Sequence, residues 1–209
     1  MIDQGFVITT FVTLFVVIDP LGLIPLFIAL TQGMSPAQRK SVGRRACLIA
    51  AVLLLIFGLL GESLLNFVGI SMPAFRIAGG ILLFLTALDM LFERRTQRRE
   101  GQHADPAHDP SVFPLAMPLI AGPGALASMI LLVGQAGTGW TGKLVVFAEA
   151  LLVIGIVLAL FRVAGPIECA LGRTGTMVIT RLLGMLLAAL SVQFVIDGVV
   201  GTGLLASTG

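Results

Sequence analysis

The chain alternates between long apolar segments and short charged ones. Six apolar segments are long enough to cross a bilayer, which takes about 20 mostly apolar residues. They run over 5–31, 46–68, 73–92, 113–135, 143–164 and 178–204. The first, fourth and sixth are long enough to tilt or to contain a break. The pattern predicts an all-α membrane protein with six transmembrane helices.

Composition supports lipid as the solvent of this chain. Hydrophobic residues make up 57% of the 209 residues and charged residues 11%, against about 45–50% and about 25% in soluble domains. The formal net charge is +2 and no segment forms a basic domain. Nucleic-acid binding therefore has no support.

The placement of basic residues predicts the orientation of the spans. Eleven of the 13 lysines and arginines fall in three segments, near 32–45, 93–112 and 162–181, and Arg76 and Lys143 fall on the other side. Basic loops stay in the cytoplasm. We therefore expect a multi-pass protein of a bacterial inner (plasma) membrane, with both termini in the periplasm.

Residues 93–112 form the longest hydrophilic segment, and we interpret them as a cytoplasmic linker. The linker separates a three-helix repeat over 1–92 from a second repeat over 113–209. His103, Asp105, His108 and Asp109 lie in it, but their spacing fits no standard metal-ligand pattern. We expect a solvated loop there and no metal site.

Two short matches relate the halves. Residues 19–25, Asp-Pro-Leu-Gly-Leu-Ile-Pro, match 118–124, Pro-Leu-Ile-Ala-Gly-Pro-Gly, with Pro20 and Pro123 103 residues apart. Arg76 and Arg181, 105 residues apart, each open a leucine-rich span and are followed by glycine three residues later. Because each half has three spans, the second half inserts upside down. The sequence predicts two inverted repeats.

The proline and glycine clusters predict that the first and fourth helices are broken. Proline removes a backbone donor and clashes with the preceding turn. Broken helices at corresponding positions of inverted halves indicate a transporter's midplane site. The expected substrate-binding residues are Asp19, Pro20, Gly22, Pro25, Gly122, Pro123 and Gly124.

A zwitterion such as an amino acid suits this site. Its carboxylate would meet amide donors near Gly22 or Gly124, and its ammonium would meet unpaired carbonyl groups or Asp19. A carboxylate at the depth of Asp19 is costly unless it is paired, hydrated or protonated. Three roles stay open for it: contact with a substrate amine, transfer of a coupling proton, and capping of the helix after the break.

Other polar residues in the spans rank below this cluster. Gln193 and Asp197 in the sixth span are candidates for a substrate pathway, and we include Gln193 among the substrate-binding residues. Small residues such as Gly79, Gly80 and Gly184 are typical of close helix packing. No nucleotide-binding loop, zinc-protease motif or nucleophile elbow appears, so we expect neither an enzyme nor a cofactor.

These motifs carry a family resemblance over nearly the whole chain. The segments 19–27, 75–80, 118–125 and 193–198 resemble the MarC family, also called the neutral amino acid transporter family, within the LysE-type group. The resemblance implies an inner-membrane protein of six spans with broken first and fourth helices. It also implies transport of small neutral amino acids such as glycine and alanine, with protons as the coupling ion.

The first hypothesis is thus a secondary transporter with small neutral amino acids, protons and membrane lipid as its partners. A channel-like pore and a non-transporting membrane scaffold are the alternatives. The oligomeric state and the direction of transport stay open.

Overall fold

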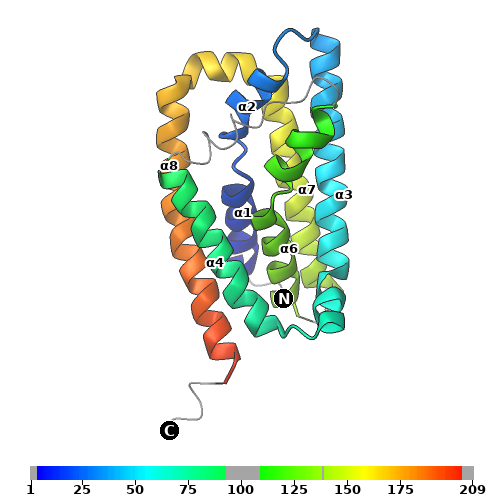
Figure 1. Cartoon of the computed structure of the whole chain (residues 1–209), viewed down its shortest axis with the longest axis vertical. Helices are drawn as coiled ribbons and strands as arrows, with labels where there is room; N and C mark the ends of the chain where they lie inside the picture. Colours follow the sequence, from blue (N-terminus) through cyan, green and yellow to red (C-terminus); the bar gives the residue numbers. More distant parts are fainter. Residues whose placement is uncertain (1–3, 93–108, 138, 204–209) are drawn as a thin grey trace.

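The computed structural model describes residues 4–92, 109–137 and 139–203, so most of the predicted linker, with His103, Asp105 and His108, lies outside the described residues. The regular elements within these ranges are helices packed into one elongated bundle (Figure 1). In chain order they are α1 (Gln4–Ile18), α2 (Leu23–Leu30), α3 (Pro36–Val68), α4 (Met72–Leu91), the π-type helix η1 (Ser111–Ile120), α6 (Pro123–Gln135), α7 (Trp140–Arg162) and α8 (Ala164–Gly201).

Five helical segments are long and apolar enough to cross a membrane. They are Gln4–Leu30, Pro36–Val68, Met72–Leu91, Trp140–Arg162 and Thr174–Gly201. A sixth span results when η1 and α6, which are bent by 54° at their junction, are taken together. The prediction of an all-helical membrane protein is confirmed, and so are the breaks in the first and fourth spans.

The broken spans lie at the centre of the bundle. In its most apolar stretch the first span is 61% buried inside the protein, whereas the four unbroken spans are 28–39% buried. Gly124, Ala125 and every residue of 127–133 in α6 are buried as well. The outer helices instead expose apolar side chains, with Phe67 of α3 89% exposed. Irregular backbone at membrane depth is stable only where protein covers it, which explains this arrangement.

The first basic segment, predicted as a loop over 32–45, is helical from Pro36 onward. Ser35 and Gln38 form a capping box, and Pro36 occupies the first turn of α3. Such a cap satisfies amide groups that the start of a helix leaves unpaired. The link before the sixth span is helical too, with a break at Gly172, whose φ is +63°. These segments are polar because they lie at the membrane surface, and they remain largely helical.

One end of the bundle, the upper end in Figure 1, carries most of the described basic residues, and we call it the basic end. It comprises the end of α2, the start of α3, the end of α7 and the start of α8, with Arg39, Lys40, Arg44, Arg45 and Arg162. Asp109 joins the second half of the chain to this end. Its carboxylate accepts a hydrogen bond from the Ser111 backbone N–H at 3.0 Å and pairs with Arg45 at 3.2 Å. Both interactions lower the pKa of Asp109.

Glycines allow α4 and α8 to pack closely as an antiparallel pair (Figure 1). A methyl group on Gly80 would lie 2.8 Å from the Ser191 carbonyl oxygen, and one on Gly198 would lie 3.0 Å from the Ile77 backbone nitrogen. Gly184 similarly faces the backbone near Ala87. Close backbone approach through small residues is the usual basis of helix association in lipid. The packing role expected for Gly80 and Gly184 is confirmed, and Gly79 packs closely against Leu131 of α6.

We predict that Gly80→Ala destabilises the protein, because the added methyl group meets backbone atoms that cannot move aside. The cost expected for overpacking is about 1–3 kcal/mol, seen as a lower melting temperature in detergent. Gly155→Ala in α7 is the matched control, since a methyl group there meets nothing within 4 Å. Equal melting temperatures for the two variants would contradict the assigned packing.

Candidate functional site

The first break lies between α1 and α2, and Asp19 forms it. Asp19 has a φ of +55°, unusual for a residue other than glycine, and it is 1% exposed. Its Oδ1 atom accepts a hydrogen bond from the Gly22 backbone N–H at 3.1 Å. The Leu23 N–H bonds to the Asp19 carbonyl oxygen at 3.1 Å. The Asp19 side chain therefore closes the turn that redirects the chain. It does not cap α2 itself, as one of its three predicted roles required, because the N-cap residue of α2 is Gly22 and has no side-chain cap.

Glycine is required at position 22 by this turn. A methyl group there would overlap the Asp19 carboxylate, lying 2.7 Å from its Cγ atom. Pro20 is buried, whereas Gly22 and Pro25 are half-buried. The four predicted residues of the first motif thus fall within one compact turn and the first residues of α2.

The second break lies between η1 and α6. Gly122 precedes α6 in an extended conformation, with φ −74° and ψ 169°, and a methyl group on it would lie 2.6 Å from the Pro118 carbonyl oxygen. Pro123 occupies the first turn of α6 and is exposed. No side chain caps this amino end. The two breaks therefore differ, since a carboxylate lies at the first and none caps the second.

Gly124 brings the two breaks to one level of the bundle. A methyl group on Gly124 would lie 3.4 Å from each of three side-chain atoms, on Val17 of α1 and on Leu83 and Thr86 of α4. Val17 is two residues before Asp19, and Gly124 is two residues after Gly122. Val17 and Gly124 thus meet inside the bundle and bring the two predicted proline-glycine motifs to one level, although Pro123 is exposed and the motifs are about one hundred residues apart in sequence.

Gln193 lies apart from this junction. Its amide Nε2 donates a hydrogen bond to the Asp197 carboxylate at 2.7 Å, and its side chain is exposed. Ser191 and Val195, each two residues away, face Gly80 of α4. Two helical residues span about 200° around the axis, so Gln193 points to the opposite side of α8. The structure does not bring it to the two breaks.

Three buried hydroxyl groups were not singled out from the sequence. Thr10 and Thr13 of α1 and Ser128 of α6 are fully buried, and their oxygens have no hydrogen-bond partner among the described residues. By contrast, the hydroxyl groups of Thr31 and Ser191 donate to carbonyl groups of their own helices, at 2.7 Å in each case. Buried polar groups normally have partners. The three hydroxyl groups therefore give the two central broken spans buried hydrogen-bonding groups that no described residue of the protein uses.

One sequence offers little means of finding these hydroxyl groups. A threonine or serine in a membrane helix ordinarily bonds to a carbonyl one turn earlier, so its presence in an apolar run is not informative. What distinguishes Thr10, Thr13 and Ser128 is burial without such a bond, and burial depends on the packing of helices distant in sequence.

We predict that Asp19→Asn folds with nearly unchanged stability, whereas Asp19→Ala is destabilised by about 1–2 kcal/mol. Asparagine keeps an oxygen that accepts the Gly22 N–H and tolerates a positive φ, and alanine does neither. Melting temperatures of the two variants in the same detergent measure the difference. If the alanine variant is as stable as the asparagine variant, the side-chain cap does not stabilise the turn.

Comparison with known proteins agrees with this architecture. The sequence model described as "MarC family integral membrane protein" matches residues 4–202. A UPF0056 membrane protein of Archaeoglobus fulgidus is 40% identical over 197 residues, covering 93% of this chain and 92% of the relative. YhcE of Escherichia coli K12, also named a UPF0056 membrane protein, is 36% identical, covering 91% and 90%. The UPF0056 membrane protein YvbG of Bacillus subtilis 168 is 34% identical, covering 96% and 94%. No solved structure matches the chain.

Proposed function

The chain belongs to the MarC family of integral membrane proteins, and we propose that it is a secondary transporter of small neutral amino acids such as glycine and alanine. The observation that carries this proposal is the meeting of two broken spans in the buried centre, where Gly124 of α6 packs against Val17 of α1. Broken helices at such a position supply backbone groups and partial charges to a substrate in many transporters.

The chemistry of the two breaks favours a zwitterion. The amino end of α6 has no side-chain cap and carries the partial positive charge of the helix dipole, which suits a carboxylate. The Asp19 carboxylate suits an ammonium group. The Gly22 amide is already bonded to Asp19, so the Gly124 end becomes the better of the two carboxylate positions considered from the sequence.

The walls favour a small substrate. The side chains of Val17, Leu83 and Thr86 approach the Cβ position of Gly124 to 3.4 Å, which is ordinary contact distance with no room for a large group. Ser128 lies one turn after Gly124 in α6, and Thr13 and Thr10 lie about 9 Å and about 13 Å before Asp19 along α1; all three supply buried hydroxyl groups in the same two spans. Glycine and alanine combine both charges with little side-chain volume, and an Asp19 that gains and loses a proton would couple their movement to a proton gradient.

Two inverted repeats, 1–92 and 113–209, are part of the proposal. Their support lies in the equivalent breaks and in the α4–α8 pair. A shift of 105 residues places Gly79 on Gly184, so α4 and α8 are the corresponding last helices of the two halves, and they pack against each other in antiparallel directions. We further propose that the basic end faces the cytoplasm of a plasma membrane, with both termini outside.

The alternatives are a channel-like pore and a scaffold that transports nothing. A pore is favoured by the same inverted arrangement, but the packed walls around Gly124 favour a site that opens by rearrangement. A scaffold would not need buried, unpartnered hydroxyl groups in its central spans. An enzyme is not proposed, since the described residues form no arrangement of nucleophile, base and oxyanion donors.

We predict saturable uptake of labelled glycine or alanine by the purified protein in liposomes, and counterflow when the vesicles are preloaded with unlabelled substrate. Asp19→Asn should fold and yet lower uptake by about tenfold or more, because a hydrogen bond to a charged group contributes about 1.5–3 kcal/mol. Gly124→Val should abolish uptake, because its side chain fills the space between the breaks.

Gly155→Ala, with open space around it, is the control for any substitution in the bundle. Unsaturable flux without counterflow would replace the transporter with a pore. Absence of flux for every small amino acid under proton and sodium gradients, with correctly folded protein, would favour the scaffold. A transporter whose Asp19→Asn variant is fully active would remove Asp19 from the substrate site.

A further inference from the structure

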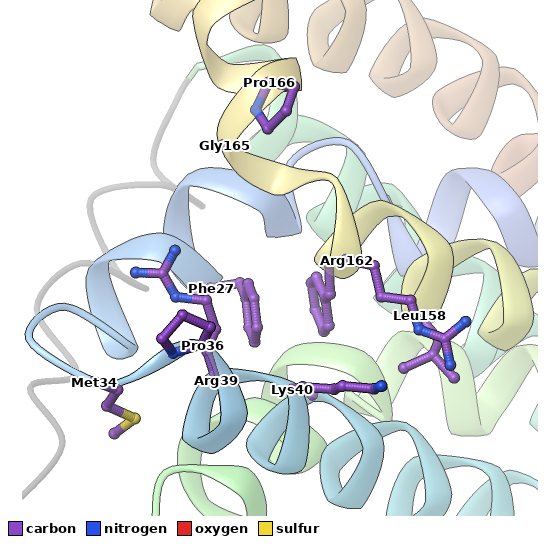
Figure 2. Close-up of a pocket in the computed structure, with 11 residues that line it drawn as sticks. Phe27, Met34, Pro36, Arg39, Lys40, Leu158, Arg162, Gly165 and Pro166 are labelled. Carbon is purple, nitrogen blue, oxygen red and sulfur yellow. The ribbon is translucent and has the colours of Figure 1, made fainter.

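A second site is indicated at the basic end, remote from the two breaks. A pocket of about 520 Å³ opens between the end of α2, the start of α3, the end of α7 and the start of α8 (Figure 2). Four segments that are distant in sequence contribute its walls. Three of its lining residues are cations, namely Arg39, Lys40 and Arg162, and no carboxylate lines it among the described residues.

The cations of the pocket lack anionic partners within the described part of the chain. The ion pairs found there involve Arg45 and Lys143, neither of which lines the pocket. In Figure 2 the side chains of Lys40 and Arg162 point toward each other. Like charges that converge without a counter-charge repel each other. Such an arrangement is stabilised when an anion binds between them.

Arg39 adds an unpaired donor on the other side of the pocket. One of its terminal nitrogens lies 3.5 Å from the Thr31 carbonyl oxygen, at the limit of a hydrogen bond. Its Nε atom is buried and has no hydrogen-bond partner among the described residues. A guanidinium group donates in a planar fork that matches the oxygens of a phosphate.

The floor of the pocket is apolar. Phe27 of α2 and Phe161 of α7 stack with their ring centroids 4.1 Å apart and their planes 7° apart. Both rings are buried, and Leu158 lies beside them in the lining. The pocket therefore has charged walls and an apolar base, which is the polarity of an amphiphile's headgroup and first chain carbons.

The position of the pocket matches the surface of the bilayer. On α3 the exposed apolar surface begins at Leu48, which is 66% exposed and eight residues after Lys40. Eight helical residues rise about 12 Å, and the headgroup region is about 5–8 Å thick in each leaflet, so the backbone of Lys40 lies at the outer edge of the headgroup region. Arg162 lies next to Val163, an exposed apolar residue, so the pocket extends inward to the level of the headgroups. Basic pockets between membrane helices are known to hold anionic headgroups.

We propose that this pocket binds the headgroup phosphate of an anionic phospholipid between Lys40 and Arg162, with Arg39 as a further cation on the opposite wall. Charge complementarity and the height of the pocket at the bilayer surface select a phospholipid over a soluble anion. The site is independent of the proposed transport function, because it shares no residue with the two breaks.

The test compares ligands by their stabilisation of the full-length protein in neutral detergent, since a ligand of the folded state raises the melting temperature. Phosphatidylglycerol should stabilise, and phosphatidylcholine and glycerol phosphate should not at equal concentration. Lys40→Gln with Arg162→Gln should weaken the apparent affinity for phosphatidylglycerol on the order of ten- to thirtyfold. The control variant, Arg44→Gln with Arg45→Gln, removes the same amount of charge from the basic end but outside the pocket. It should change the apparent affinity for phosphatidylglycerol less than threefold.

Chemical labelling provides a readout that needs no variant. The chain has two lysines, Lys40 and Lys143, and Lys143 lies beside Glu62 at 4.0 Å, away from the pocket. Bound phosphatidylglycerol should slow acetylation of Lys40 relative to Lys143. Equal stabilisation by glycerol phosphate would reassign the site to a soluble phosphate. If the two double variants weaken the apparent affinity equally, or if the labelling ratio of Lys40 to Lys143 is the same with and without the lipid, the pocket is not the lipid site.

Discussion

Backbone hydrogen bonding at membrane depth is the constraint on which this structure depends. Each broken span has N–H and C=O groups that a continuous helix would have paired, and lipid offers them no partner. The fold resolves this by placing the broken spans in the centre and surrounding them with α3, α4, α7 and α8 (Figure 1). The exposed apolar side chains of these outer helices then face the lipid.

Because of this constraint, the two breaks place different polar groups at the centre of the bundle. At the first break a side chain of the protein satisfies the redirected backbone, since Asp19 accepts the Gly22 N–H. At the second break Gly122 offers no such side chain, and Pro123 has no N–H of its own. The first break thus has a carboxyl group and the second has the amino end of a helix, with its partial positive charge, and Gly124 packs against Val17 between them. This pairing of groups is the basis for proposing a zwitterionic substrate.

Apolar runs and clustered helix breakers were enough to predict the spans and the two breaks. The start of α3 is not predicted in the same way, because the charged residues near Pro36 suggest a loop. Ser35 and Gln38 nevertheless form a capping box, which is a signal of a helix start that the sequence contains. Gln193 shows a different limit. Its polarity suggested a pathway, but the side of α8 it occupies is set by the contact of Gly80 with Ser191. The unpartnered state of Thr10 and Ser128 likewise depends on neighbours that one sequence does not reveal.

The junction of the breaks is connected to the rest of the bundle through α4. Leu83 and Thr86 of this helix contact the Gly124 position, and Gly80 and Ala87, at neighbouring positions around the helix axis, contact α8. Packed helices move as units with discrete arrangements and not by continuous deformation. In the proposed transporter, a shift of α4 together with α8 would move the wall of the junction that Leu83 and Thr86 form. The central spans, which supply the polar groups, need not unfold for that wall to open.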